Sequence, residues 1–411
     1  MLLRGNAVVG QSGGPTAAIN ATLAGVIMGA LDAGDGAIDK IYGMRNGIEG
    51  LLEEKLIDLG SIFSEKSMFD DLALTPAAAL GSCRRKLPSD YSDAIYSRIF
   101  SVFSEYNIRY FFYIGGNDSM DTVLKLSGYA DKIGYDIRII GVPKTIDNDL
   151  EGTDHTPGYG SAAKYVAITV KELLRDCSVY TLKAVTIVEI MGRDAGWLTC
   201  ASALPKLSGG DMPDLIYLPE RPFDMEEFLN SVANAFERHP NILVAVSEGI
   251  RFKDGRYVGE SAQSGNVDVF GHRYLAGTGK VLESAVKERF GCKARSVELS
   301  LTQRCAAHVA SYTDISESVE TGRRAVGFAL EGKSGCMVSV EREQDRSLYS
   351  IRYNAKNVGE IANKVKRVPD EFINESGNGV TDACIEYMRP LIIGEVSPLY
   401  ENGLPRHIVI G

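Results

Sequence analysis

One short loop of this sequence combines a cation with two carboxylates. Residues 141–149 read Gly-Val-Pro-Lys-Thr-Ile-Asp-Asn-Asp, so that Lys144 precedes Asp147 and Asp149. One carboxylate can take a proton from an attacking hydroxyl while the other holds Mg²⁺, and Lys144 with the hydroxyl of Thr145 can grip a phosphoryl group. An ordinary turn is the alternative, because Asp and Asn favour turns through local hydrogen bonds. The neighbouring loops decide between these interpretations.

A first glycine-rich loop lies near the start of the chain. Residues 12–16 read Ser-Gly-Gly-Pro-Thr and precede an uncharged stretch that predicts a helix over residues 20–30, with Pro15 suited to its first turn. Gly13 and Gly14 let main-chain amides approach a phosphate, and the helix dipole adds positive potential. A connection from strand to helix can need the same glycines without a ligand, so this loop alone leaves both interpretations open.

A second loop repeats this arrangement. Gly115 and Gly116 follow an apolar run, and Asn117, Asp118 and Ser119 come next. Each of these polar residues could cap a helix, but three in succession after two glycines favour a ligand site. Neither loop has the spacing Gly-x-Gly-x-x-Gly or Gly-x-x-x-x-Gly-Lys-Ser/Thr, so dinucleotide-binding and P-loop interpretations lack their fingerprints.

Positive charge is concentrated at residues 81–86, which read Gly-Ser-Cys-Arg-Arg-Lys, in an otherwise acidic chain. The 44 basic and 54 acidic residues give a net charge of −10, which disfavours general binding to nucleic acid or to an anionic membrane. A phosphate site must therefore be locally basic. Arg84 is a candidate for it, with a solvated basic turn as the alternative.

Short apolar runs rich in β-branched and aromatic residues alternate with helical stretches along the chain. This alternation predicts an α/β fold with parallel sheets covered by helices, which bind ligands at the carboxyl ends of their strands. With 411 residues, 45% hydrophobic and 24% charged, the chain is long enough for two or three such units. The predicted strands lie at residues 7–9, 109–114, 137–142, 184–190, 215–218 and 242–246.

The seven cysteines are odd in number and widely spaced, and they contain no Cys-x-x-Cys. This pattern argues against a disulfide framework or a zinc site, and a reducing cytoplasm fits it best. The stretch from Ala7 to Leu31 carries no charge, but Gln11, Pro15 and Asn20 are among the residues that interrupt it. We therefore expect neither a signal peptide nor a membrane span there.

Taken together, these motifs and a later Met-Gly-Arg run resemble the phosphofructokinase family. Order and spacing agree from residue 5 to the Gln303–Arg304 region, and Pro-x-Thr-Ile-Asp-Asn-Asp with a downstream Met-Gly-Arg is hardly produced by turn chemistry alone. From Lys333 onward no motif is assigned, and this region looks like a family-variable extension. The residues that carry the resemblance are Gly13, Gly14, Arg84, Gly115, Gly116, Asn117, Asp118, Ser119, Lys144, Thr145, Asp147, Asp149, Met191, Gly192, Arg193 and Glu248.

The resemblance implies two Rossmann-like three-layer α/β/α domains, with mostly parallel sheets and an active site in the cleft between them. A donor-binding domain would comprise residues 1–160 plus about 304–370, and a sugar-phosphate domain residues 161–303 plus about 371–411. Because some substrate contacts in the family cross a subunit interface, a homodimer or homotetramer is expected.

The reaction that the resemblance implies is phosphoryl transfer to the 1-hydroxyl of fructose 6-phosphate with Mg²⁺ as cofactor. Asp147 would be the base, and Asp149 with Asn117 would position the metal or its waters. Thr145, Arg84 and the glycine amides would stabilise the charge of the transition state. Positions that match the sugar-phosphate site of the family are Thr145, Asp147, Asp149, Met191, Gly192, Arg193, Glu248, Arg295 and Arg304.

Two positions in this family correlate with the phosphoryl donor, and ATP-dependent members typically have glycine at both. Here they are Asp118 and Lys144. A carboxylate in place of glycine fills and repels the space of an ATP α-phosphate, and lysine supplies charge for a small tetra-anionic donor. The resemblance therefore favours inorganic pyrophosphate over ATP and suggests a reversible reaction. Expected donor contacts are Gly13, Gly14, Gly115, Gly116, Asp118, Ser119 and Lys144.

Three positions depart from the family pattern. Asn117 stands where many relatives have aspartate, Ala184 where many have a phosphate-binding arginine, and Leu301 where histidine is common. An ATP-dependent enzyme and a non-catalytic sugar-phosphate sensor on the same fold are the alternatives. Retention of Asp147, Asp149 and Arg193 argues against the sensor. Residues better interpreted as packing or capping than as catalytic are Cys83, His155, Trp197 and His308.

Overall fold

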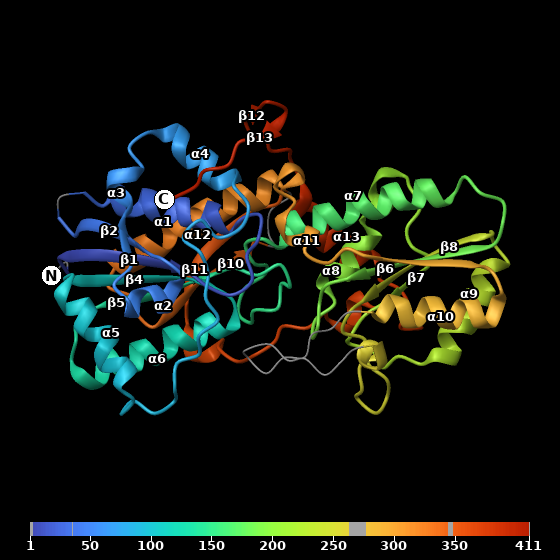
Figure 1. Ribbon diagram of the computed structural model, residues 1–411, viewed down its shortest axis with the longest axis horizontal. Helices are drawn as coiled ribbons and strands as arrows, with labels where there is room; N and C mark the ends of the chain where they lie inside the picture. The colour runs from blue at the N-terminus through green and yellow to red at the C-terminus, as the bar shows by residue number, and fades with distance from the viewer. Residues whose placement is uncertain (1–2, 35, 263–276, 344–347, 411) are drawn as a thin grey trace.

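The computed structural model describes residues 3–34, 36–262, 277–343 and 348–410, which fold into two α/β units lying side by side (Figure 1). Each unit has one central sheet with helices packed on both faces, so each is a three-layer structure. The expected fold class is confirmed.

The first sheet has seven strands in the order β11-β10-β5-β4-β1-β2-β3. The outermost strands, β3 and β11, are antiparallel to their neighbours, and the other pairs are parallel. Continuous apolar runs form the central strands because helices cover both faces. The strands are β1 (Gly5–Gln11), β2 (Ile38–Met44), β3 (Leu56–Asp58), β4 (Ile108–Gly115), β5 (Arg138–Pro143), β10 (Cys336–Arg342) and β11 (Ile351–Asn357).

Separate apolar cores lie on the two faces of this sheet. One contains residues of α1, α3, α4 and α12, and the other contains residues of α2, α5 and α6. The helices α1 and α12 approach so closely at Gly25 that an added Cβ would lie 1.9 Å from the Val319 carbonyl oxygen. The helices are α1 (Ile19–Asp32), α2 (Gly47–Leu52), α3 (Leu59–Ile62), α4 (Lys66–Leu74), α5 (Ala94–Glu105), α6 (Asn117–Ile133) and α12 (Tyr312–Leu330).

The second sheet has four parallel strands in the order β7-β8-β6-β9. One face packs against α7, α8, η1 and α13, and the other against α9 and α10. Its elements are β6 (Ala184–Ile190), β7 (Leu215–Tyr217), β8 (Asn241–Ser247), β9 (Lys293–Glu298), α7 (Tyr159–Cys177), α8 (Trp197–Cys200), η1 (Ala201–Ser208), α9 (Met225–Phe236), η2 (Val258–Ala262), α10 (Thr278–Phe290), α11 (Thr302–Cys305) and η3 (Ala307–Val309).

The region after Lys333 is part of both units. After β10 and β11 the chain crosses to the second unit (Figure 1), and the chain end returns to the first, where Ile410 is buried in the core and Arg406 pairs with Asp71. This region is therefore integral to the fold, and the last residues of the expected 371–411 segment pack on the first unit. The remaining elements are η4 (Val358–Glu360), η5 (Asp370–Phe372), α13 (Asp382–Met388), η6 (Arg389–Ile392), β12 (Tyr400–Glu401) and β13 (Leu404–Pro405).

All six predicted strands overlap strands of the structure, but the helix after the first glycine-rich loop differs. It begins at Ile19, so Pro15 lies in the loop and not in the first helical turn. All seven cysteines are free. Within the described part of the chain, no helix is both long and apolar enough to span a membrane.

Candidate active site

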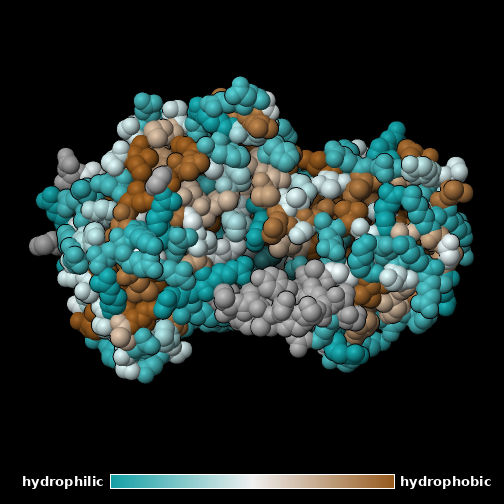
Figure 2. Space-filling view, in the orientation of Figure 1, coloured by the Kyte–Doolittle hydropathy of each residue, from teal (hydrophilic) through white to brown (hydrophobic). Residues whose placement is uncertain are grey.

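A cavity of about 360 Å³ lies between the two units. The loops after β1, β4 and β5 of the first unit and after β6 and β8 of the second contribute to its wall, as expected for ligand sites of open α/β sheets. Hydrophilic residues also gather between the units on the face shown in Figure 2. The predicted residues that line it are Gly13, Gly14, Arg84, Gly116, Asn117, Asp118, Ser119, Lys144, Thr145, Asp147, Asp149, Met191, Arg193, Glu248 and Arg304.

Lys144 links the two glycine-rich loops. It follows the end of β5 and is only 3% exposed. Its main-chain amide donates to the Gly115 carbonyl (3.0 Å), and its ammonium donates to the Gly14 carbonyl (2.6 Å). The side chain is thus held at the cavity wall by neutral acceptors, which leaves its positive charge available to an anion.

Asp147 is oriented by the residue two positions before it. The Asp147 amide donates to the Thr145 hydroxyl (3.1 Å), which in turn lies 3.4 Å from a carboxylate oxygen of Asp147. Thr145 is fixed in its turn, because its carbonyl accepts a hydrogen bond from Thr156 (2.8 Å). Between the two cavity-lining carboxylates, Asn148 adopts a left-handed conformation with φ of 52°, so Asp147 and Asp149 both reach the cavity from one tight bend.

The ionisable groups of the cavity have strongly shifted pKa values. Burial lowers the pKa of Lys144 to about 8, although Asp147 opposes this shift. Burial raises the pKa of Asp147 against the pull of Lys144 and Arg193, and burial reinforced by Asp147 raises the pKa of Asp149 to about 7. Burial therefore disfavours the charged forms of these groups, as is typical of functional sites.

The first glycine-rich loop is tied to the basic loop. The Gly13 amide donates to the Cys83 carbonyl (3.1 Å), and the Ser82 hydroxyl donates to the Gly13 carbonyl (2.6 Å). Gly13 has φ of 77°, which favours glycine. An added Cβ on Gly14 would lie 2.9 Å from the guanidinium of Arg304. These contacts bring Arg84 and Arg304, distant in sequence, to one side of the cavity.

The second glycine-rich loop leads directly into a helix. The helix α6 begins at Asn117, and the Ser119 hydroxyl contacts the hydroxyl of Ser12 from the first loop. An added Cβ on Gly115 would lie 1.8 Å from the Ser119 hydroxyl. Gly115 is therefore needed so that the two loops can meet, while the amino end of α6 adds positive potential at the cavity.

Asn117 has the features of a cation ligand. Its side-chain oxygen is buried and has no hydrogen-bond partner among the described residues. Within those residues, no group of three or more His, Cys, Asp or Glu side chains could hold a metal. Oxygen ligands from Asn117 and Asp149 suit a hard divalent cation, which would complete its coordination with water and donor oxygens.

The second unit contributes a different set of groups. The Gly192 amide donates to a carboxylate oxygen of Glu248 (3.3 Å), and the Met191 amide donates to the Gln303 side chain (3.2 Å). Burial raises the pKa of Glu248 to about 7, against the hydrogen bond from Gly192. With Arg193 in the cavity wall, this side offers both positive charge and carboxyl groups that can hold a polar substrate.

Comparison with known proteins agrees with this geometry. The phosphofructokinase family model matches residues 6–328. The chain belongs to the phosphofructokinase family. A pyrophosphate–fructose 6-phosphate 1-phosphotransferase from Methylococcus capsulatus is 42% identical over 408 residues, covering 98% of this chain and 96% of that protein. A sulfofructose kinase from Alkalicoccus urumqiensis is 32% identical, covering 90% of this chain and 88% of that protein.

Solved structures of the family have the same fold. A pyrophosphate-dependent phosphofructokinase from Nitrosospira multiformis superposes with a TM-score of 0.88 at 39% identity, covering 98% of this chain and 96% of that one. The Pichia pastoris phosphofructokinase, at 18% identity and a TM-score of 0.68, shares the fold alone. The similarity to the Nitrosospira multiformis structure therefore includes the region after Lys333.

Three residues expected at the site do not line the cavity. Gly115 and Gly192 lie just behind it and act through the contacts described above. Arg295 is exposed on β9, an edge strand of the second sheet. Within one chain of this phosphofructokinase-family protein, Arg295 therefore lies outside the site that Arg304 helps to form.

Several residues that line the cavity were not assigned from the sequence. Arg85 adjoins Arg84 in the basic run, so its charge could have indicated it. The Thr16 hydroxyl is buried without a hydrogen-bond partner among the described residues, and only its position after the glycines could have identified it. The complete set missed is Ser12, Pro15, Thr16, Cys83, Arg85, Thr122, Ile146, Asp194, Ala195 and Val365.

The remaining departures from the family pattern lie away from the cavity wall. Leu301 is 57% exposed, and neither it nor Ala184 lines the cavity. Lys183, which adjoins Ala184 and could have replaced the family arginine there, lies over the ring of Phe236 at 4.9 Å and does not line the cavity. Of the residues expected to pack or cap, Trp197 and His155 are buried, whereas Cys83 is buried but also lines the cavity.

Proposed function

We propose that this chain catalyses reversible phosphoryl transfer from inorganic pyrophosphate to the 1-hydroxyl of fructose 6-phosphate. The observation that carries the proposal is that Asp118, Lys144 and Asp147 line one cavity. A candidate base and the two residues that distinguish the donor thus lie in a single site. Relatives that match nearly the whole chain are named for this reaction.

The charges around Asp118 and Lys144 favour a small anion over a nucleotide as the phosphoryl donor. The Asp118 carboxylate forms an ion pair with Lys86 at 3.1 Å, which fixes a negative charge where ATP-dependent members have glycine. The buried Lys144 and the exposed Arg84 provide positive charge in the wall of the same cavity. The Asp118 side chain would occupy space that a nucleotide needs, whereas pyrophosphate needs only the cationic part of the wall.

The chain's own residues divide the work of the reaction. Asp147 accepts the proton of the sugar 1-hydroxyl as its oxygen bonds to phosphorus, and the bridging P–O bond of pyrophosphate breaks to release phosphate. Its raised pKa strengthens its affinity for this proton. Lys144 and Arg84 stabilise charge on the transferring group and the leaving phosphate. Arg193, Glu248 and the other second-unit residues would orient the sugar phosphate.

We assign Mg²⁺ as the divalent cation that Asn117 and Asp149 would hold. The unpartnered amide oxygen of Asn117 and the Asp149 carboxylate, which lines the same cavity, fit a hard cation. When bound, such a cation would neutralise charge on the phosphate oxygens. The free cysteines also fit our placement of the protein in a reducing compartment such as the cytoplasm.

The direct test is formation of fructose 1,6-bisphosphate from fructose 6-phosphate with Mg²⁺, comparing pyrophosphate with ATP. We expect turnover with pyrophosphate alone. Turnover with ATP alone would retain the role of Asp147 but refute the donor assignment. Binding of sugar phosphate without turnover from either donor would establish the non-catalytic sensor instead.

We further propose that the working enzyme is a homo-oligomer in which Arg295 of one subunit contacts the sugar phosphate in the site of another. Its exposure on β9 supports this proposal. Mixed oligomers of Arg295→Ala and Asp147→Asn chains test it, because one site of each mixed dimer would contain both native residues. Activity that reappears on mixing two nearly inactive variants is expected; a monomer in sedimentation experiments, or no recovery in verified mixed oligomers, would refute it.

A further inference from the structure

Residues 364–368, for which the sequence indicated no role, contact the loops that contain Asn117 and Asp149. The Asn117 side-chain amide donates to the Lys364 carbonyl (2.7 Å). Two residues later, the main-chain amide of Lys366 donates to the Asp149 carbonyl (2.8 Å). Both proposed cation ligands are thus held by the backbone of this one segment.

The same segment is also bonded to the second unit. The Trp197 indole donates to the Lys366 carbonyl (3.0 Å). The Val368 amide donates to a Glu220 carboxylate oxygen (3.0 Å), which also accepts a hydrogen bond from the Gly196 amide (2.9 Å). Since Gly196 closes the loop that contains Arg193, the segment connects loops on both sides of the cavity.

The Lys366 side chain points into the bend that contains the catalytic carboxylates. Its ammonium donates to the Asn148 side-chain oxygen (3.2 Å) and to the carbonyls of Thr153 (3.1 Å) and Asp154 (2.7 Å). All three N–H groups of the ammonium are therefore used. A lysine that only covered the surface would leave its ammonium in solvent.

Asn148 is the residue on which these contacts converge. It is fully buried and has left-handed φ of 52°, while its neighbours Asp147 and Asp149 line the cavity. Lys366 binds the oxygen of its amide group, and Tyr387 lies 3.0 Å from the nitrogen. Because both ends of the amide are fixed, rotation of the Asn148 backbone, which would displace both carboxylates, is opposed.

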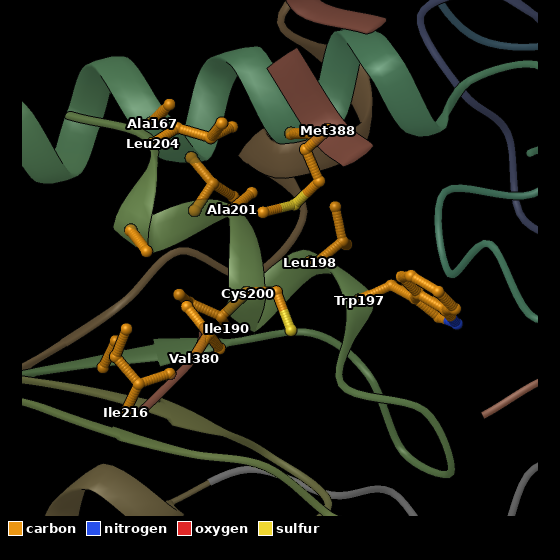
Figure 3. Packing of buried hydrophobic residues seen from close by; sticks show 14 of the residues in the cluster. Ala167, Ile190, Trp197, Leu198, Cys200, Ala201, Leu204, Ile216, Val380 and Met388 are labelled. Atoms are coloured by element: carbon orange, nitrogen blue, oxygen red, sulfur yellow. The ribbon is translucent and has the colours of Figure 1, made fainter. Parts of the chain in front are cut away.

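Aromatic packing anchors this arrangement to the core of the second unit. Figure 3 shows Trp197 at the edge of the apolar cluster, with its indole directed away from Leu204 and Met388. The Lys366 ammonium lies 5.1 Å from the centre of this ring, and the ring lies 5.2 Å from that of Tyr387. The catalytic bend of the first unit is therefore fastened to a buried side chain of the second.

We propose that Lys366 is a positioning residue for phosphoryl transfer, which fixes Asn148 and thereby places Asp147 and Asp149. This inference rests on the proposed role of Asp147 as the base. In this role, the segment 364–368 holds the bend at residues 147–149, the catalytic bend, in a fixed position relative to the second-unit loop that contains Arg193.

Lys366→Met removes the ammonium and keeps most of the aliphatic stem. We expect kcat with pyrophosphate to fall about 100-fold, the loss typical of a small misplacement of reacting groups. KM for either substrate should change less than about threefold, because Lys366 does not contact them. The exposed neighbour Arg367 provides the matched control, and Arg367→Met should leave kcat within about twofold of the native value. Native kcat in Lys366→Met would overturn the proposal.

A double-mutant cycle separates positioning from general damage. In an Asp147→Asn background, Lys366→Met should cost less than about threefold, since the group that it positions is already lost. A full and independent loss in both backgrounds would overturn the proposal. If Lys366→Met shows no cooperative unfolding transition, Tyr387→Phe removes only the hydroxyl beside Asn148, and the same cycle applies with an expected loss of about tenfold.

The same experiments distinguish failure of this inference from failure of the proposed function. Retention of kcat by Asp147→Asn would refute the base assignment whatever Lys366→Met does. Collapse of kcat in Asp147→Asn together with native kcat in Lys366→Met would refute the positioning role alone.

Discussion

The chain from Asp147 to His155 contains carboxylates in two opposite situations. Asp147 and Asp149, the cavity carboxylates, have pKa values raised by burial, to about 7 for Asp149. Burial would also raise the pKa of Asp154, but the hydrogen bond from His155 (2.8 Å) and the charges of His155 and Arg342 hold it below its ordinary value. For the same residue type, a few positions apart, burial therefore outweighs the nearby cations on one side, while direct pairing outweighs burial on the other.

The paired side forms a rear cluster of Asp154, His155 and Glu317. The second ring nitrogen of His155 lies 2.6 Å from Glu317 of α12. Burial opposes protonation of His155, yet the two carboxylates raise its pKa to about 9. This contrast indicates that the rear cluster stabilises the fold, whereas burial of the cavity carboxylates costs stability, as is common at functional sites.

Replacing a cavity carboxylate should affect catalysis far more than stability. For Asp147→Asn we expect kcat to fall by about 10³- to 10⁴-fold, because the base is lost. The thermal midpoint should stay the same or rise, because an amide avoids the cost of a buried charge. Turnover with pyrophosphate and thermal unfolding, measured on the same preparation, check both points. A large fall in the midpoint would show that Asp147 is structural.

The next largest effect on turnover is expected at Lys144 and Asp118, the residues that indicate the donor. Lys144→Gly should lower kcat/KM for pyrophosphate by about 100-fold, because a buried charge-assisted contact to the donor is lost. Combined with Asp118→Gly, it should admit some ATP-dependent turnover. Assays with both donors measure this effect, and undiminished use of pyrophosphate by the double variant would contradict the donor assignment.

The rear cluster should respond in the opposite way. His155→Gln removes the cation shared by the partly buried carboxylates of Asp154 and Glu317, although Arg342 still pairs with Asp154. It should lower the free energy of unfolding by about 3 kcal/mol. The loss of kcat at a permissive temperature should remain below about tenfold. The exposed His308 offers a control, and His308→Gln should change the free energy of unfolding by less than about 0.5 kcal/mol. Equal stability of the two variants would remove the distinction between rear cluster and cavity.

The smallest effect is a pH dependence of stability. Because the folded-state pKa of His155 is raised from 6.5 to about 9, its contribution is complete below pH 6.5 and is lost as pH rises through 9. The groups that face it are Asp154, Glu317 and, through Asp154, Arg342. We expect native protein to lose about 2 kcal/mol more than His155→Gln between these pH values. Parallel pH profiles in denaturant unfolding would contradict this expectation.

The sequence predicted the residues of the cavity better than the strands and side chains that hold them in place. The cavity loops were identifiable because glycine pairs, Asp and Lys follow apolar strands. The strands β2 and β9 escaped notice because both contain charged residues, as in the run Lys-Ala-Arg-Ser-Val-Glu of β9, where an edge position leaves side chains in solvent. The position of Arg85 in the cavity wall could be inferred from the charge of its sequence run. The role of Lys366 could not, since no local pattern distinguishes a lysine with a buried ammonium from an exposed one.

By itself, the sequence determined the α/β class and the family, and it predicted the bend with Asp147 and Asp149 and the residues that indicate the donor. These depend on local chemistry, because a strand, a turn and a polar triplet are adjacent in the chain. Only the tertiary structure decided that residues 364–368 support the bend, that Arg295 lies outside the site, and that the chain end packs on the first unit. Such features depend on contacts between distant segments, where burial and pairing are set by the whole fold.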